Sequence, residues 1–166
     1  MSRFTRRPPA PESDENDPCG AEAKARYSSR LSKENVEIAR RLFAEWERGN
    51  FWALTELYAP DVEWHWSRNA RALRGGSASY RGLAEIGVAM QEWLSDWGCF
   101  RVSAEEFIDA GDRVVVMSEV HARLKDDRGE VHDHQADVIT VRDGKIVRME
   151  TFDGRHEALE ALGLRK

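Results

Sequence analysis

The sequence predicts an α+β domain in which helices pack on a mostly antiparallel sheet. Two observations indicate this class. Apolar residues recur at intervals of three and four in the first half of the chain, as in amphipathic helices. Between 106 and 152, β-branched runs are separated by turns of the Asp-Gly type, as in a β-meander. Because helical and strand segments are segregated rather than alternating, we expect a largely antiparallel sheet.

Composition excludes several classes of function. The chain has 166 residues, enough for one domain with an ordinary core. Its 25 basic and 30 acidic side chains give a net charge of −5, so we expect neither nucleic acid nor a membrane as a partner. No apolar run approaches the ~20 residues that span a bilayer. Residues 1–11 lack the apolar centre of a secretory signal, and Cys19 and Cys99 make no disulfide framework, so we expect a cytoplasmic protein.

The chain is expected to divide at about residue 30. Residues 1–30 are predicted to form a disordered tail, because they are rich in proline and charge and hold almost nothing apolar. Residues 31–166 are predicted to form the folded domain.

Helices are expected at the start of this domain. Ser32 can cap the first helix, whose apolar stripe reaches Trp46. Gly49 is placed to end it. A second, short helix is predicted over 51–58, since Pro60 cannot continue a helix.

A short strand, a loop and a third helix are predicted next. Alternation over 61–66 places Trp64 and Trp66 on one face of a strand. Residues 67–81 are expected to form a long loop. A helix then runs from Gly82 to 97, and after the meander a last short helix covers 155–162.

Several short motifs lie at the expected boundaries of these helices and strands. They are Glu47–Asn50, Ala59–Val62, Tyr80–Gly82, Asp109–Val115, Val141–Val147 and Ala158–Gly163. In this order the sequence from 35 to 164 resembles the SnoaL-like family of the nuclear-transport-factor-2-like superfamily. The resemblance implies a cone-shaped fold: a curved, mostly antiparallel sheet wrapped around three helices, with an apolar pocket and a short C-terminal helix. It also implies a homodimer formed through the outer sheet face.

Asp137 is the residue that does not fit its strand. Pairing the hairpin across 126–129 places it on the apolar face, opposite Ser118. At the next turn two partners remain open: Glu150 after a two-residue turn, or Met149 after a three-residue turn with a bulge, which we favour. A carboxyl buried there has a raised pKa, which suits acid–base chemistry. The alternative is an Asp that is bonded to backbone or solvated at the pocket mouth.

The resemblance also implies a site. Asp137 occupies the strand position where the ketosteroid isomerases and polyketide cyclases carry a pocket Asp, so it is the predicted catalytic residue. The predicted ligand-binding residues around it are Trp64, Trp66, Tyr58, Ser118 and Met149. The isomerases' other two groups, a Tyr and a general-base Asp, are replaced by Leu42 and Trp66. Asp133 is a weak candidate for the second Asp of an epoxide hydrolase.

Three histidines are predicted on the opposite, outer face. His121, His132 and His134, with Glu119 nearby, could bind zinc. Because this face forms dimers in the superfamily, we favour a hydrogen-bonded interface cluster and assign no metal ligand.

The sequence therefore favours a small enzyme of the cyclase, isomerase or hydrolase kind that needs no cofactor. Its substrate would be an apolar or aromatic small molecule in a pocket lined by Trp. The alternative is a module of the same fold that binds a small ligand, or dimerises, without catalysis.

Overall fold

A six-stranded sheet forms the centre of the computed structural model, which describes residues 18–69, 71 and 78–164. The strand order is β2-β1-β6-β5-β4-β3, and neighbours are antiparallel except for the parallel pair β1–β6. The strands are β1 (Tyr58–His65), β2 (Ser79–Arg81), β3 (Trp97–Ala110), β4 (Arg113–Leu124), β5 (Glu130–Arg142) and β6 (Lys145–Phe152). The predicted antiparallel meander is confirmed as β3 to β6.

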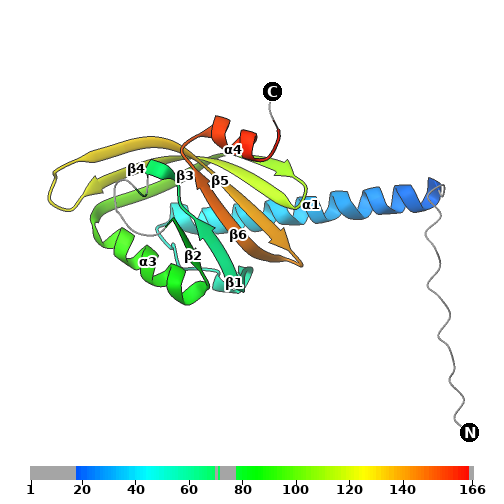
Figure 1. Cartoon of the computed structure of the whole chain (residues 1–166), viewed down its shortest axis with the longest axis horizontal. Helices are drawn as coiled ribbons and strands as arrows, with labels where there is room; N and C mark the ends of the chain where they lie inside the picture. Colours follow the sequence, from blue (N-terminus) through cyan, green and yellow to red (C-terminus); the bar gives the residue numbers. More distant parts are fainter. Residues whose placement is uncertain (1–17, 70, 72–77, 165–166) are drawn as a thin grey trace, which may run out of the picture.

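Helices cover both faces of this curved sheet (Figure 1). The long helix α1 (Pro18–Glu47) and α3 (Leu83–Ser95) pack on one face, and the short helix α4 (Arg155–Ala161) packs on the other. The predicted fold class, a cone-shaped α+β domain with a short C-terminal helix, is confirmed. None of the described helices is long and apolar enough to cross a membrane.

The start of the first helix differs from the prediction. Helix α1 begins at Pro18 rather than at Ser32. Proline suits a first helical position, and the exposed pairs Glu22–Arg26 and Arg30–Glu34 support the first turns at the spacing i, i+4. Figure 1 shows this part of α1 extending beyond the sheet. Residues 1–17 of the predicted tail lie outside the described residues, and the domain boundary stays a prediction.

The predicted second helix is wrong. Only one 3-10 turn forms, over Thr55–Leu57, and it follows Leu54, whose φ of 57° lies in the left-handed region. Phe51 instead packs against the rings of Trp46 and Phe100, with centroids 6.1 and 5.6 Å away. Tertiary packing therefore overrides local helix propensity in this segment.

Two further boundaries are corrected. Helix α3 ends at Ser95, and Trp97 opens β3 opposite Leu124 instead of closing the helix. Within the predicted loop, Ser79–Arg81 forms the edge strand β2 beside β1. Residues 70 and 72–77 of that loop lie outside the described part of the chain.

The β4–β5 hairpin is two residues out of the predicted register. Asp137 lies opposite Val116, and Ser118 lies opposite Gln135. The turn takes up the difference, since the backbone N–H of Leu124 donates to the carbonyl of Gly129. A shift of two residues keeps every side chain on its predicted face, so Asp137 still points to the helices.

The β5–β6 turn agrees with neither predicted partner of Asp137. Asp143 and Gly144 form a two-residue turn with φ values of 50° and 72°, as in a type I′ turn. A bulge at Val147 then shifts the ladder by one residue, so Asp137 lies opposite Thr151. Met149 lies opposite Ile139 and faces inward, as expected.

The two faces of the sheet carry separate cores. The larger one joins β1, β3, β4, β5 and β6 to α1 and α3. The smaller one lies under α4 and consists of Val115, Met117, Ala136, Val138 and Ala158. Helix α4 therefore covers part of the outer face within one chain.

We expect Asn35→Ala to loosen the contact between α1 and the sheet. The buried Asn35 amide donates a 3.1 Å hydrogen bond to the Gly111 carbonyl in the β3–β4 turn. Its loss should lower the free energy of unfolding by about 1–2 kcal/mol, measured by urea denaturation. The exposed Lys33→Ala on the same helix is the control, and an equal loss in both variants would contradict the prediction.

Candidate functional site

A cavity of about 70 Å³ lies between the sheet and the two helices of the larger core. One end is polar and is formed by neighbouring strands, with Gln135 and Asp137 on β5 and Thr151 on β6. The rest is apolar and comes mainly from α1, β1, α3 and β3. Its lining residues are Trp46, Phe51, Trp64, Trp66, Met90, Trp93, Phe100 and Val102.

Local sequence explains how the polar end forms. Gln135 and Asp137 are two residues apart on one strand, so they share a face. The bulge at Val147 places Thr151 opposite Asp137 on the next strand. Trp64 lies on β1, opposite Met149 of β6, and its ring forms the apolar wall beside this polar end.

Both carboxylate oxygens of Asp137 accept hydrogen bonds. The Thr151 hydroxyl donates to Oδ1 over 2.6 Å, and the Gln135 amide donates to Oδ2 over 3.1 Å. The indole N–H of Trp64 donates in turn to the Thr151 hydroxyl oxygen over 3.4 Å. This chain of donors fixes the orientation of a carboxyl that is only 1% exposed.

Burial determines the acidity of this site. Removal from water raises the pKa of Asp137 to about 6, and the hydrogen bonds from Thr151 and Gln135 hold it below a still higher value. Burial also raises the pKa of Tyr58, and the negative charge of Asp137 adds to that rise. Near neutral pH, Asp137 can therefore both release and accept a proton, which is the property of a general acid–base group.

The apolar wall is one continuous cluster of rings. Trp46 and Trp64 are stacked, with centroids 5.8 Å apart and planes 11° apart. Trp66 and Trp93 meet edge to face at 5.3 Å. Such ring pairs pack more favourably than burial alone implies, so the wall has a defined shape.

The cavity is small for an organic ligand. A volume of about 70 Å³ holds only a few water molecules, whereas organic ligands usually occupy several hundred Å³. A second cavity of about 60 Å³ adjoins it and shares the side chains of Trp93, Phe100 and Gln135. Movement of these three side chains would join the two cavities.

The structure brings only some of the predicted residues together at the cavity. Asp137, Trp64 and Trp66 line it. Tyr58, Ser118 and Met149 are buried nearby in the sheet but are not among its lining residues. The Ser118 hydroxyl has no hydrogen-bond partner among the described residues.

Two polar members of the site were not predicted. Gln135 lies two residues before Asp137 on β5, so both side chains point to the same face of the sheet. This spacing is visible in the sequence. Thr151 meets Asp137 only because of the bulge, which has no clear signature in the sequence. Leu42 lies fully in the core and does not line the cavity. Among the described residues that do line it, Asp137 alone is ionisable.

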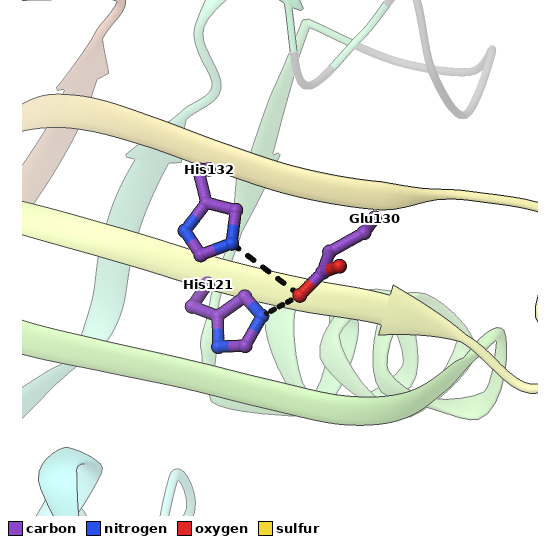
Figure 2. Close-up of side chains that lie close together, drawn as sticks. All are labelled: His121, Glu130 and His132. Atoms are coloured by element: carbon purple, nitrogen blue, oxygen red, sulfur yellow. Dashed lines mark hydrogen bonds and ion pairs between the residues drawn. The ribbon is translucent and has the colours of Figure 1, made fainter.

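The predicted histidine cluster lies on the other face of the sheet and has changed members. His121 and His132 meet Glu130 rather than Glu119 (Figure 2). His134 lies apart, 3.3 Å from a carboxylate oxygen of Glu105.

Comparison with known proteins identifies the family. Residues 39–149 match the family model described as the SnoaL-like domain. The chain belongs to the SnoaL-like family. The predicted resemblance is thereby confirmed, although no curated protein sequence matches this SnoaL-like chain significantly.

Solved structures share the fold of this SnoaL-like protein. TerC, co-crystallized with polyporic acid, is 26% identical with a TM-score of 0.63, covering 78% of this chain and 97% of TerC. A protein from a Jannaschia species, described as SnoaL-like and polyketide cyclase-like, is 18% identical with a TM-score of 0.61, covering 81% and 94%. A protein with a ketosteroid isomerase-like fold from Catenulispora acidiphila, in complex with trimethylamine, is 20% identical with a TM-score of 0.59, covering 78% and 94%. The last two similarities, below 25% identity, establish the fold alone.

We expect Asp137→Asn to remove a pH dependence of stability. The folded chain keeps the Asp137 proton up to about pH 6, whereas the unfolded chain loses it near the ordinary value of 3.8. The protonated carboxyl therefore stabilises the fold below about pH 4, and this contribution is lost as pH rises through 6. The Asn variant should gain on the order of 3 kcal/mol over the wild type between pH 4 and 7.

Urea denaturation at several pH values measures this difference. Asn can still accept from Thr151, and the Gln135 amide can turn to accept from Asn. Asp133→Asn, an exposed position on the same strand, is the matched control. A difference between Asp137→Asn and wild type that stays constant with pH would contradict the prediction.

Proposed function

We propose that this SnoaL-like protein is a small enzyme of the cyclase, isomerase or hydrolase kind that works without a cofactor. Its substrate is an apolar or aromatic small molecule, and Asp137 is its acid–base group. One observation carries the proposal: an ionisable side chain, buried and oriented by two donors, forms the polar end of an aromatic cavity.

The chemistry follows from this environment. Asp137 as a carboxylate takes a proton from a substrate carbon or hydroxyl, or, in a hydrolysis, from a water molecule that attacks the substrate. As a carboxylic acid it returns the proton to another substrate atom or to the leaving group. The reaction then leaves the enzyme unchanged and consumes no oxidant or reductant. Thr151 holds the carboxyl in position, and Gln135 offers an amide to a substrate oxygen. The apolar wall excludes water, which strengthens these polar contacts.

The substrate is larger than either small cavity alone. Trp93, Phe100 and Gln135 separate the two small cavities, so a substrate of several rings would displace them and occupy both. The similarity to TerC, co-crystallized with polyporic acid, supports an organic ligand of this kind.

The alternative is a protein of the same fold that binds a small ligand, or dimerises, without catalysis. The narrow cavity favours it, as does the single ionisable side chain among the described residues that line that cavity. By the family resemblance, Leu42 and Trp66 would take the positions where ketosteroid isomerases carry their other catalytic groups. In this alternative Asp137 fixes the polar end of a ligand, or is only a buried structural group.

A ligand retained through native purification, identified by mass spectrometry, supplies the molecule to test. With it, we expect Asp137→Asn to lower turnover by about 100-fold or more and to change affinity little. Thr151→Val keeps the carboxyl but removes a hydrogen bond that lowers its pKa, so the pH–rate profile should move to higher pH. Thr140→Val on the outer face is the control and should leave the profile in place.

The opposite result identifies a binding module. If Asp137→Asn only weakens binding, and no retained ligand is converted, the enzyme proposal is wrong. Native chain that retains no small molecule under any condition would instead favour the dimerisation module.

We also propose a homodimer formed through the outer sheet face. Helix α4 covers only the apolar part of that face, and Glu119 and His134 lie exposed beyond it. Sedimentation velocity should give the mass of two chains for the wild type and of one chain for Glu119→Arg. Gln91→Arg on the far helix α3 should remain dimeric, and a wild-type monomer would contradict the proposal.

We place the protein in the cytoplasm because Cys99 is a free thiol, which cell fractionation can check.

A further inference from the structure

Three side chains converge on the outer side of the β4–β5 hairpin (Figure 2). His121 and His132 are direct cross-strand partners, and Glu130 precedes His132 by two residues on β5. The two imidazole rings are stacked, with centroids 4.1 Å apart and planes 12° apart. Both Nε2 atoms contact the same oxygen of Glu130, His132 at 3.3 Å and His121 in a short hydrogen bond.

We propose that His121, Glu130 and His132 form a binding site for a divalent transition-metal ion of the zinc type. Imidazole nitrogen and carboxylate oxygen are the ligand atoms that zinc and its neighbours in the first transition row accept. Three protein ligands leave a fourth position for water. This site lies on the outer face, opposite Asp137, and does not depend on the proposed reaction, although the proposed homodimer uses the same face.

The distances suit such an ion. Ligands at roughly 2.0 Å from a tetrahedral ion are about 3.3 Å from one another. The ligand atoms of the three residues all lie within 4.8 Å of one another, and the separation between His132 and Glu130 is 3.3 Å. A modest turn of the Glu130 carboxylate away from His121 would open the space that the ion needs.

The sheet holds the two histidines side by side. The ladder pairs on either side, Val120 with Asp133 and Ala122 with Val131, fix the backbone at the site. Stacking turns both Nε2 atoms toward Glu130, and because the ring planes are only 12° apart, one ring must rotate before both nitrogen lone pairs point at the same ion. The side chains of His121 and His132 are 36% and 61% exposed in a single chain, so an ion and its water can reach them from solvent in the monomer.

The same strand provides a matched control. His134 lies two residues beyond His132 on the same face and also contacts a carboxylate, that of Glu105. Among the described residues its imidazole pairs with Glu105 alone, and His134 belongs to no group of three ligand residues there. If zinc bound nonspecifically to exposed histidines, substitution of His134 and substitution of His132 would weaken zinc binding equally.

Isothermal titration of the full chain with zinc chloride, after removal of metal with a chelator, tests the site. We expect one saturable ion per chain. His132→Asn and Glu130→Gln should each weaken binding at least tenfold, since loss even of an outer partner costs a metal site about 10–100-fold. His134→Asn should leave the affinity unchanged, and zinc should raise the melting temperature of the wild type but not of His132→Asn.

Three results would overturn the site. They are no saturable binding to the wild type, equal losses in His134→Asn and His132→Asn, or undiminished binding by the double variant His121→Asn/His132→Asn. Far-ultraviolet circular dichroism checks that each variant keeps its fold. Activity of the chain does not enter the test, so failure here leaves the proposal for Asp137 standing.

Discussion

Asp137 sits on an interior strand with its charge removed from water, and the two donors that hold it shape the surrounding structure. An unpaired carboxylate in such a place would cost several kcal/mol, so its neighbours must offer hydrogen bonds. Gln135 does so from the same strand and Thr151 from the next one. These contacts require one register for β5 and β6, and that register determines which residues of β6 and β1 reach the cavity. The position of Trp64, whose indole continues the chain of donors, depends on the same pairing.

The aromatic wall and the polar end have opposite physical requirements, and different elements meet them. Rings from α1, α3 and β3 fill space and exclude water, and their edge-to-face contacts leave little volume. The strands supply direction, because a side chain on a ladder is aimed by the backbone on both sides. The helices contribute large side chains that fill space, but they position individual polar atoms less closely than a strand does. This division explains why all three polar residues of the cavity come from β5 and β6.

Sequence reasoning succeeded where periodicity decides the answer. The face on which Asp137 lies was predictable, because alternation along β4 and β5 survives a shift of two residues. The family motifs at turns and helix ends identified the fold. The structure differs from the prediction where the exact length of a turn or a bulge sets the pairing: Thr151 replaced both expected partners of Asp137, and Glu130 replaced Glu119 beside the histidines. The lost second helix reflects packing of Phe51 on distant rings, which local propensity does not contain.

The bulge at Val147 also limits the charge that the cavity can hold. With regular pairing after the Asp143-Gly144 turn, Glu150 would lie opposite Asp137, and two carboxyls would share the interior. With the bulge, the neighbour is a neutral hydroxyl, so the described side chains of the 70 Å³ cavity carry either no charge or one negative charge, whereas Asp133 and Asp153 line the adjoining cavity. An acidic ligand that enters as an anion meets repulsion unless Asp137 takes up a proton at the same time. Entry of such a ligand would therefore be coupled to the uptake of one proton, whereas entry of a neutral molecule would not.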